Sequence, residues 1–141
     1  MSVVPPEVAG EALALEVAGG VQIALALVHV VFPRYFRWRE ELPRLSLVNA
    51  EMMRVHTLFV ALVVFGVGAL SLGWADDIAG AAFGQVFAKA VAVFWGVRLV
   101  VQFWGYSAEL WRGKRFETAV HVVFASLWTA LTALYAWVGF R

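Results

Sequence analysis

Three histidines are the side chains of this 141-residue chain best suited to bind a cofactor. His29, His56 and His121 each lie in or beside an apolar stretch long enough to cross a membrane. Polar residues in such stretches are costly and usually face the interior of a helix bundle. Imidazole nitrogens on facing helices can ligate a haem iron or a divalent metal. The histidines therefore support two cofactor hypotheses.

The first hypothesis is a haem b site. The second and fourth helices of a sequential four-helix bundle are diagonal to each other, so His56 and His121 would be the two axial ligands. Arg98 lies inside the third apolar stretch, where a guanidinium needs an acidic partner. We expect Arg98 to contact a haem propionate in this case.

The second hypothesis is a metal site with three nitrogen ligands from His29, His56 and His121. Glu51 or Gln102 would add an oxygen ligand or orient one of the rings. The chain has no cysteine, which excludes a thiolate site and a disulfide framework. It also lacks the HExxH, Glu-x-x-His and Walker-type motifs.

A different class of function needs no cofactor. Intramembrane histidines commonly make polar contacts between helices that contribute about 0.6 kcal/mol on average. The chain would then be a non-enzymatic membrane subunit, or a carrier that binds a lipid-like small molecule. A third class, an oligomeric channel, lacks the repeated charged ring of a selectivity filter.

The elements that position these residues are predicted to be membrane-spanning helices. Hydrophobic residues make up 62% of the chain and the mean hydropathy is +0.79, far above soluble domains. We expect an all-α, four-transmembrane-helix bundle as a single integral membrane domain, residues 1–141. The four helices are expected at about residues 12–32, 47–73, 81–106 and 116–140. The first can extend back to Pro6, because proline is tolerated in the first turn of a helix. Ser46 is the predicted N-cap of the second helix.

Polar residues within two of these helices are spaced so that they share a face. Arg98 and Gln102 are four residues apart, which places them one turn apart on the third helix, and Trp95 and Tyr106 or Gly105 continue the same stripe. A row on the fourth helix follows alternating steps of three and four residues: Thr118, His121, Ala125, Trp128, Thr132 and Tyr135. This row predicts that His121 faces the inside of the bundle.

The charges predict the orientation in the membrane. Short connections rich in Lys and Arg stay in the cytoplasm, and the two basic hairpins carry these residues: Arg34, Arg37, Arg39, Arg44 and Arg54 in the first, Arg112, Lys114 and Arg115 in the second. The turn between the second and third helices contains Asp76 and Asp77. Both hairpins are therefore expected to be cytoplasmic and both termini outside, in a bacterial inner membrane.

The partners expected from this arrangement are the lipid bilayer and its anionic headgroups. The four arginines nearest the headgroups are Arg34, Arg37, Arg39 and Arg44. The aromatic residues of the inner interface are Tyr35, Trp38, Trp104, Tyr106 and Trp111. A homo-oligomer or a membrane complex fits this composition, whereas a net charge of +1 gives no reason to expect nucleic acid.

The chain resembles a family of small four-helix proteins of the bacterial inner membrane. The resemblance rests on the phrases FPRYF (residues 32–36), WREEL (38–42), HTLF (56–59) and LWRGKRFETAVH (110–121). More distantly, the chain is similar to the four-helix, haem-containing bacterial protoporphyrinogen oxidases, with Pro33, Arg34 and Phe36 at the exit of the first helix and Lys89 early in the third. In that family the first-helix histidine lies well upstream of the exit, whereas His29 is four residues before Pro33. The likeness implies the layout and the haem hypothesis, and it assigns no ligand.

Overall fold

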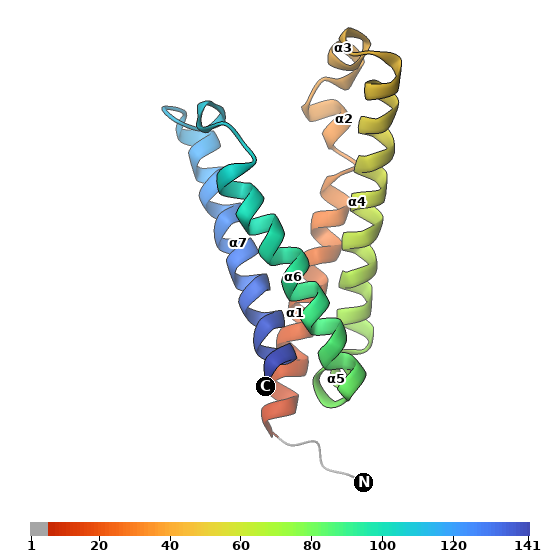
Figure 1. Ribbon diagram of the computed structural model, residues 1–141, viewed down its shortest axis with the longest axis vertical. Coiled ribbons are helices and arrows are strands. Elements are labelled where there is room, and N and C mark those ends of the chain that lie inside the picture. Colours follow the sequence, from red (N-terminus) through yellow and green to blue (C-terminus); the bar gives the residue numbers. More distant parts are fainter. Residues whose placement is uncertain (1–5) are drawn as a thin grey trace. The chain divides into compact units, whose positions relative to one another are not determined.

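The computed structural model describes residues 6–141, and all regular secondary structure in this range is helical. The elements are α1 (Pro6–Val28), α2 (Phe32–Tyr35), α3 (Trp38–Glu41), η1 (Leu42–Arg44), α4 (Leu47–Gly73), α5 (Ala75–Gly80), α6 (Ala82–Trp104), η2 (Ala108–Leu110) and α7 (Arg115–Phe140) (Figure 1). Four of them, α1, α4, α6 and α7, are long and apolar enough to cross a membrane. The prediction of an all-α chain with four such helices is confirmed for the described residues.

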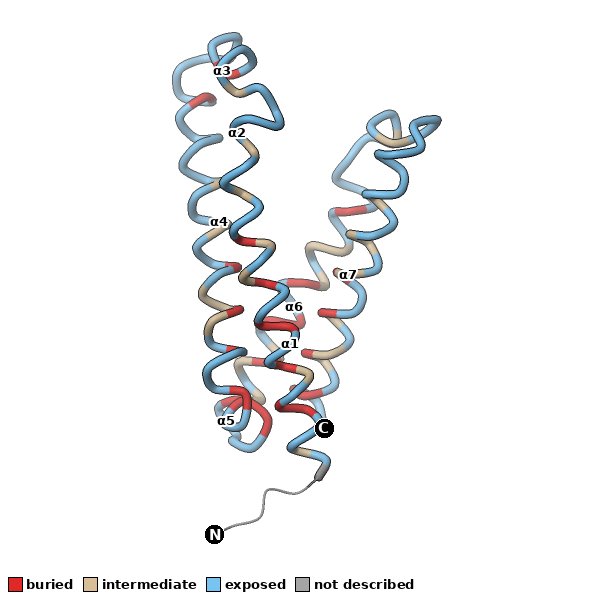
Figure 2. Tube along the Cα trace, turned by 180° about the vertical axis from the view of Figure 1, so that it is seen from behind, coloured by how far each residue is buried: buried red, intermediate tan, exposed pale blue. Residues whose placement is uncertain are grey.

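Large apolar side chains on these helices are exposed. Leu47, Phe83 and Trp104 have exposed fractions of 77%, 82% and 81%. Figure 2 shows the long helices mostly in pale blue, with the buried residues in red as separate bands. Exposed apolar surface of this extent is typical of membrane or interaction surfaces. The burial pattern therefore agrees with helices that face lipid.

The contacts within the chain define two compact units. One unit is Leu13–Ala75, which contains most of α1 and all of α4; the other contains residues 6–12 and Asp76–Arg141, with α6 and α7. Each unit is an antiparallel pair of long helices (Figure 1). The prediction of a single domain stays a prediction.

Two glycines bring α1 and α4 into backbone contact. A Cβ atom added to Gly19 would lie 2.6 Å from the carbonyl oxygen of Gly68 and 2.7 Å from the amide nitrogen of Leu72. A Cβ atom added to Gly68 would lie 2.8 Å from the carbonyl oxygen of Gly19. Small residues permit such close approach, which gives van der Waals contact and is a common basis of helix association in membranes.

Helix α1 ends at Val28, four residues before the predicted end, because Pro33 follows. The proline has no N–H to donate to the carbonyl of His29, and its ring would clash there in a continuing helix. The amides of His29, Val30 and Val31 instead bond to carbonyls three residues earlier, at 2.9–3.2 Å. His29 therefore lies just after α1. The extension of this helix back to Pro6 is seen in the structure.

The other boundaries have local causes. Ser46 caps α4, since its hydroxyl oxygen accepts a bond from the amide of Asn49 at 3.4 Å, which confirms the predicted N-cap. The acidic segment between α4 and α6 forms the short helix α5 rather than an open turn. Gly113 has a φ of +79°, which only glycine adopts without strain, and it turns the chain into α7.

Helices α6 and α7 pack closely along their length. A Cβ atom on Gly139 would lie 2.9 Å from the amide nitrogen of Lys89, so the start of α6 and the end of α7 are in backbone contact. Beside this contact, Nη1 of Arg141 lies 2.6 Å from Oε2 of the buried Glu11, and Arg141 also donates to the carbonyl of Ala79. This packing fixes the register of α6 against α7.

Candidate functional site

A group of polar and aromatic side chains lies between α6 and α7, on the half of the pair nearer to η2. We call it the Arg98 cluster, and its members are Trp95, Arg98, Gln102, Tyr106, Trp111, His121 and Trp128. Arg98 and Gln102 are one turn apart on α6, and His121 and Trp128 are two turns apart on α7. Because the two helices are antiparallel, these pairs face each other.

The buried side-chain amide of Gln102 connects three members of the cluster. Its oxygen Oε1 accepts bonds from Nη1 of Arg98 at 3.1 Å and from Nε1 of Trp128 at 3.3 Å. Both partners can only donate. The oxygen of the amide must therefore face them, and the NH₂ group must face His121.

This orientation determines the protonation of the His121 ring. Nε2 of Gln102 lies 2.8 Å from Nδ1 of His121, and since the amide nitrogen can only donate, Nδ1 is the acceptor. The proton of the neutral ring is then on Nε2. A histidine that ligates a metal through Nε2 normally carries its proton on Nδ1 and donates it to an oxygen. The geometry at His121 is the reverse of that arrangement.

Arg98 is a half-buried cation without an acidic partner among residues 6–141. Its guanidinium carbon lies 5.0 Å from the ring centroid of Trp128 and 5.6 Å from that of Tyr106. Each such contact contributes about 0.5 to 2 kcal/mol, depending on solvent exposure. The four ion pairs of the described residues involve other arginines. One of its five N–H groups donates to Gln102. The guanidinium therefore has further N–H groups that can donate to a ligand.

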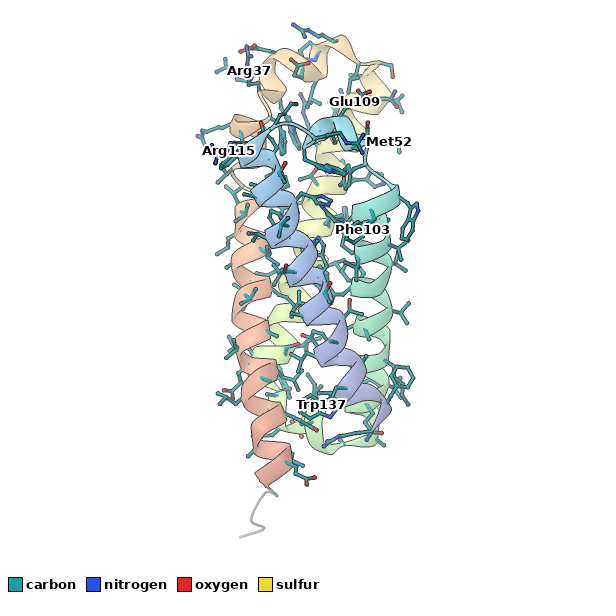
Figure 3. All side chains as sticks on the ribbon, turned by 90° about the vertical axis from the view of Figure 1, so that its left-hand side faces the viewer. Arg37, Met52, Phe103, Glu109, Arg115 and Trp137 are labelled. Atoms are coloured by element: carbon teal, nitrogen blue, oxygen red, sulfur yellow. The ribbon has the colours of Figure 1, made fainter. Side chains whose placement is uncertain are left out.

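Aromatic rings surround the polar groups. Trp95 and Trp128 stack with centroids 4.8 Å apart and an interplanar angle of 10°. Trp111 stacks on His121 at 4.0 Å, and Phe103 meets the edge of the same imidazole at 5.7 Å. Figure 3 shows Phe103 near the end of α6 that leads to η2. The rings border the polar side chains and restrict their rotamers.

The other two histidines bond within their own segments of the Leu13–Ala75 unit. Nδ1 of His29 lies 2.9 Å from the carbonyl oxygen of Leu25, and Nδ1 of His56 lies 2.9 Å from that of Met52. A carbonyl only accepts, so Nδ1 of both rings carries a proton, and the lone pair of the neutral ring is on Nε2. His56 is exposed and His29 is half-buried against Phe32 at 4.6 Å.

The predicted cofactor residues are divided between the two units. His29, His56 and Glu51 belong to one unit, and Arg98, Gln102 and His121 to the other. Glu51 forms an ion pair with Arg54 at 2.7 Å. Within residues 6–141, no group of three or more histidine or carboxylate side chains could hold a metal ion. The haem site and the shared three-histidine site stay predictions.

No family model matches this sequence, and neither a curated protein nor a solved structure is detectably similar to it.

One contact of the cluster was not predicted from the sequence, the stacking of Trp111 on His121. Tyr106 was predicted on the stripe of Arg98, and its ring does lie near that guanidinium. The position of both residues at the membrane interface stays a prediction. The predicted row on the fourth helix included Trp128 and His121, and both do face α6. Thr118, the first residue of that row, is instead exposed and donates to the carbonyl of Trp111 at 2.7 Å.

Proposed function

We propose that this chain is a membrane subunit or carrier of the bacterial inner membrane, and that its Arg98 cluster binds the acid group of an amphipathic, lipid-like small molecule. The observation that carries the proposal is the state of Arg98. Its guanidinium lies within a candidate membrane span, between two aromatic rings, with no carboxylate within 4.0 Å among residues 6–141.

The cost of an unpaired charge supports an acidic ligand. Arg98 is six residues before the end of α6, or about 9 Å along the helix axis. An arginine deep in a bilayer costs roughly 2.5–3.5 kcal/mol by insertion scales, although a shallower position costs less. A carboxylate or phosphate would neutralise the charge and accept two parallel N–H bonds from the guanidinium fork.

The surroundings of Arg98 suit a ligand with a long apolar part. The acid group would meet the Arg98 cation, which donates one of its N–H groups to Gln102 and can donate others to a ligand. The apolar part would lie against the more exposed rings beside the cluster, Phe103 and Phe124, because Trp95 and Trp128 are buried. A molecule with one acid group and a hydrocarbon chain matches both requirements.

The experiment is a fluorescence titration of the purified protein in a neutral detergent. A brominated long-chain fatty acid, whose bromine atoms quench tryptophan, is compared with its uncharged methyl ester. We expect saturable quenching by the acid and about tenfold weaker binding of the ester, as the loss of one charge-assisted hydrogen bond implies. Arg98→Gln should lower the affinity for the acid to that for the ester.

A matched control is available on the same helix. Lys89→Gln removes a positive charge from α6 at the end remote from the cluster, where the ammonium lies 5.3 Å from the ring centroid of Phe140. This variant should bind the acid as the wild type does. Equal loss in both variants would mean that the acid responds to net charge rather than to the cluster.

We also propose the orientation in which the connection from α1 to α4 and the connection from α6 to α7 face the cytoplasm. The support is the clustering of arginine and lysine in these two connections, set against Asp76 and Asp77 in α5. Figure 3 shows Arg115 at the start of α7 and Trp137 near its other end, so the helix has a basic end and an aromatic end. Both features are typical of membrane interfaces.

A redox or metal-dependent role is the second candidate, and one observation favours it. His29 and His56 both donate Nδ1–H to a carbonyl, which leaves the Nε2 lone pair free for a metal or haem iron. A visible spectrum and elemental analysis of the purified protein separate the candidates. A Soret band that disappears in His56→Ala would favour haem, and a colourless protein without stoichiometric metal would exclude this class.

A further inference from the structure

We propose that the connection between α1 and α4 contains a binding site for a phosphate group, formed by Arg34 and Arg39. The site is separate from the Arg98 cluster and lies in the other unit of the chain. The basic hairpin as a whole was expected to contact anionic headgroups. The proposed site assigns the contact to two side chains, Arg34 and Arg39.

The residues of this connection line an open hollow of about 540 Å³. Its lining residues are Val30, Pro33, Arg34, Arg37, Arg39 and Glu40. Sites for small molecules and cofactors commonly have volumes of about 300–1,000 Å³. The hollow is therefore large enough for a phosphate group together with part of the molecule that carries it.

The charges around the hollow do not cancel. Arg37 pairs with Glu40, so these two side chains neutralise each other. Arg34 and Arg39 have no carboxylate within 4.0 Å among the described residues. Two cations remain without a counter-charge, and a phosphate diester or monoester would supply one or two negative charges.

The backbone conformation at Arg37 brings these cations to one hollow. Arg37 has φ 52° and ψ 43°, in the left-handed region that residues other than glycine rarely adopt, and it separates α2 from α3. Arg34 comes from α2 and Arg39 from α3, on either side of Arg37, and both line the hollow. Strained backbone of this kind is often found at binding sites.

The position of the hollow in the chain fits the chemistry of a headgroup. It follows the end of α1 at Val28 and precedes the start of α4 at Leu47, and both helices are candidate membrane spans. A connection between two spans lies at the level of the lipid phosphates. Arginine is well suited to this ligand because its planar fork matches two phosphate oxygens.

The test is a ³¹P NMR titration of the purified protein in neutral detergent. Three probes are used in separate arms: short-chain phosphatidylglycerol, short-chain phosphatidylcholine and inorganic phosphate. We expect saturable binding of phosphatidylglycerol or of inorganic phosphate, and the arm that saturates identifies a lipid or a free source of the phosphate group. Absence of saturable binding in all three arms would overturn the proposal.

The variants separate a built site from general attraction to a basic surface. Arg34→Gln and Arg39→Gln should each weaken binding by about tenfold, as the loss of a charge-assisted hydrogen bond implies. The matched control is Arg44→Gln, which removes the same charge from the same connection at a residue paired with Glu41 at 3.2 Å and outside the hollow. Binding should change less than about twofold in this control, because a paired, exposed charge contributes little.

Equal weakening in all three variants would overturn the proposal in favour of nonspecific charge attraction. Arg34, Arg39 and Arg44 are exposed, so their replacement leaves the apolar packing of the unit intact, and circular dichroism checks this. The fatty-acid titration at the Arg98 cluster should be unchanged in these variants. The phosphate titration therefore tests this site, and the fatty-acid titration tests the proposed function independently of it.

Discussion

The tautomer of His121 decides which chemistry this ring can take part in. Gln102 presents its NH₂ group to Nδ1 because Arg98 and Trp128, both obligatory donors, hold its oxygen. His121 therefore offers a donor at Nε2, whereas His29 and His56 offer an acceptor there. The acid group of a ligand would accept a bond from the Nε2–H of His121, whereas a metal ion would bind the Nε2 lone pair of His29 or His56.

This difference predicts the ¹⁵N NMR spectrum of the protein labelled at histidine. One neutral ring should carry its proton on Nε2 and two on Nδ1. In Gln102→Glu the carboxylate would accept from Nδ1 and pair with Arg98, so the His121 proton should move to Nδ1. A wild-type His121 already protonated on Nδ1 would contradict the arrangement of the cluster.

The contacts of the cluster that lie within one helix were predictable from the sequence. The spacing of four residues between Arg98 and Gln102 indicates contact on one helix, and the bond at 3.1 Å confirms it. Gln102 was expected to add an oxygen ligand or to orient one of the histidine rings, but the choice of His121 was not predicted, since no sequence pattern gives the register of α6 against α7. The contact of Trp111 with His121 was not predicted, because an aromatic residue near a basic turn has the same sequence pattern whether it faces lipid or a histidine.

At the scale of the helices, backbone contact at Gly19 and Gly68 sets how closely α1 and α4 approach. Two small residues of α1, Ala18 and Ala26, are buried as well. The glycine contact itself was not predicted, because several glycines in these helices meet nothing within 4 Å. The early end of α1 follows from Pro33, whose effect reaches back one turn to His29.

A pair of alanine variants tests this contact. Gly19→Ala would put a Cβ atom 2.6 Å from a carbonyl oxygen, so we expect a loss of about 1–3 kcal/mol in unfolding free energy. Gly20→Ala is the matched control, since nothing lies within 4 Å of its Cβ position and alanine favours helix over glycine by about 0.5–1 kcal/mol. Thermal unfolding in detergent measures both. Equal midpoints would contradict the close approach of α1 and α4.

At the scale of the whole molecule, the four spans were predictable because each is a continuous apolar run of membrane length. The structure of the connections between them was less predictable, since α2, α3, η1 and η2 are too short to have a periodic pattern. The sequence predicts an orientation through its charges, and the absence of cysteine makes that orientation simple to test.

Single cysteines introduced at exposed positions should report the two sides. In intact bacterial cells a membrane-impermeant maleimide should label Asp76→Cys, in α5, and leave Lys114→Cys, before α7, unlabelled until the cells are opened. The wild-type chain has no cysteine, so the purified wild-type protein should carry no maleimide label. The reverse pattern would show that the basic connections face outward.

The central claim is that Arg98 recognises the acid group of a lipid-like molecule. Its most direct test is the ratio of the affinities for the brominated fatty acid and its methyl ester, measured by tryptophan quenching. Recognition of the acid group by Arg98 predicts a ratio of about ten in the wild type and in Lys89→Gln, and a ratio near one in Arg98→Gln. A wild-type ratio near one, or a ratio that survives Arg98→Gln, would contradict it.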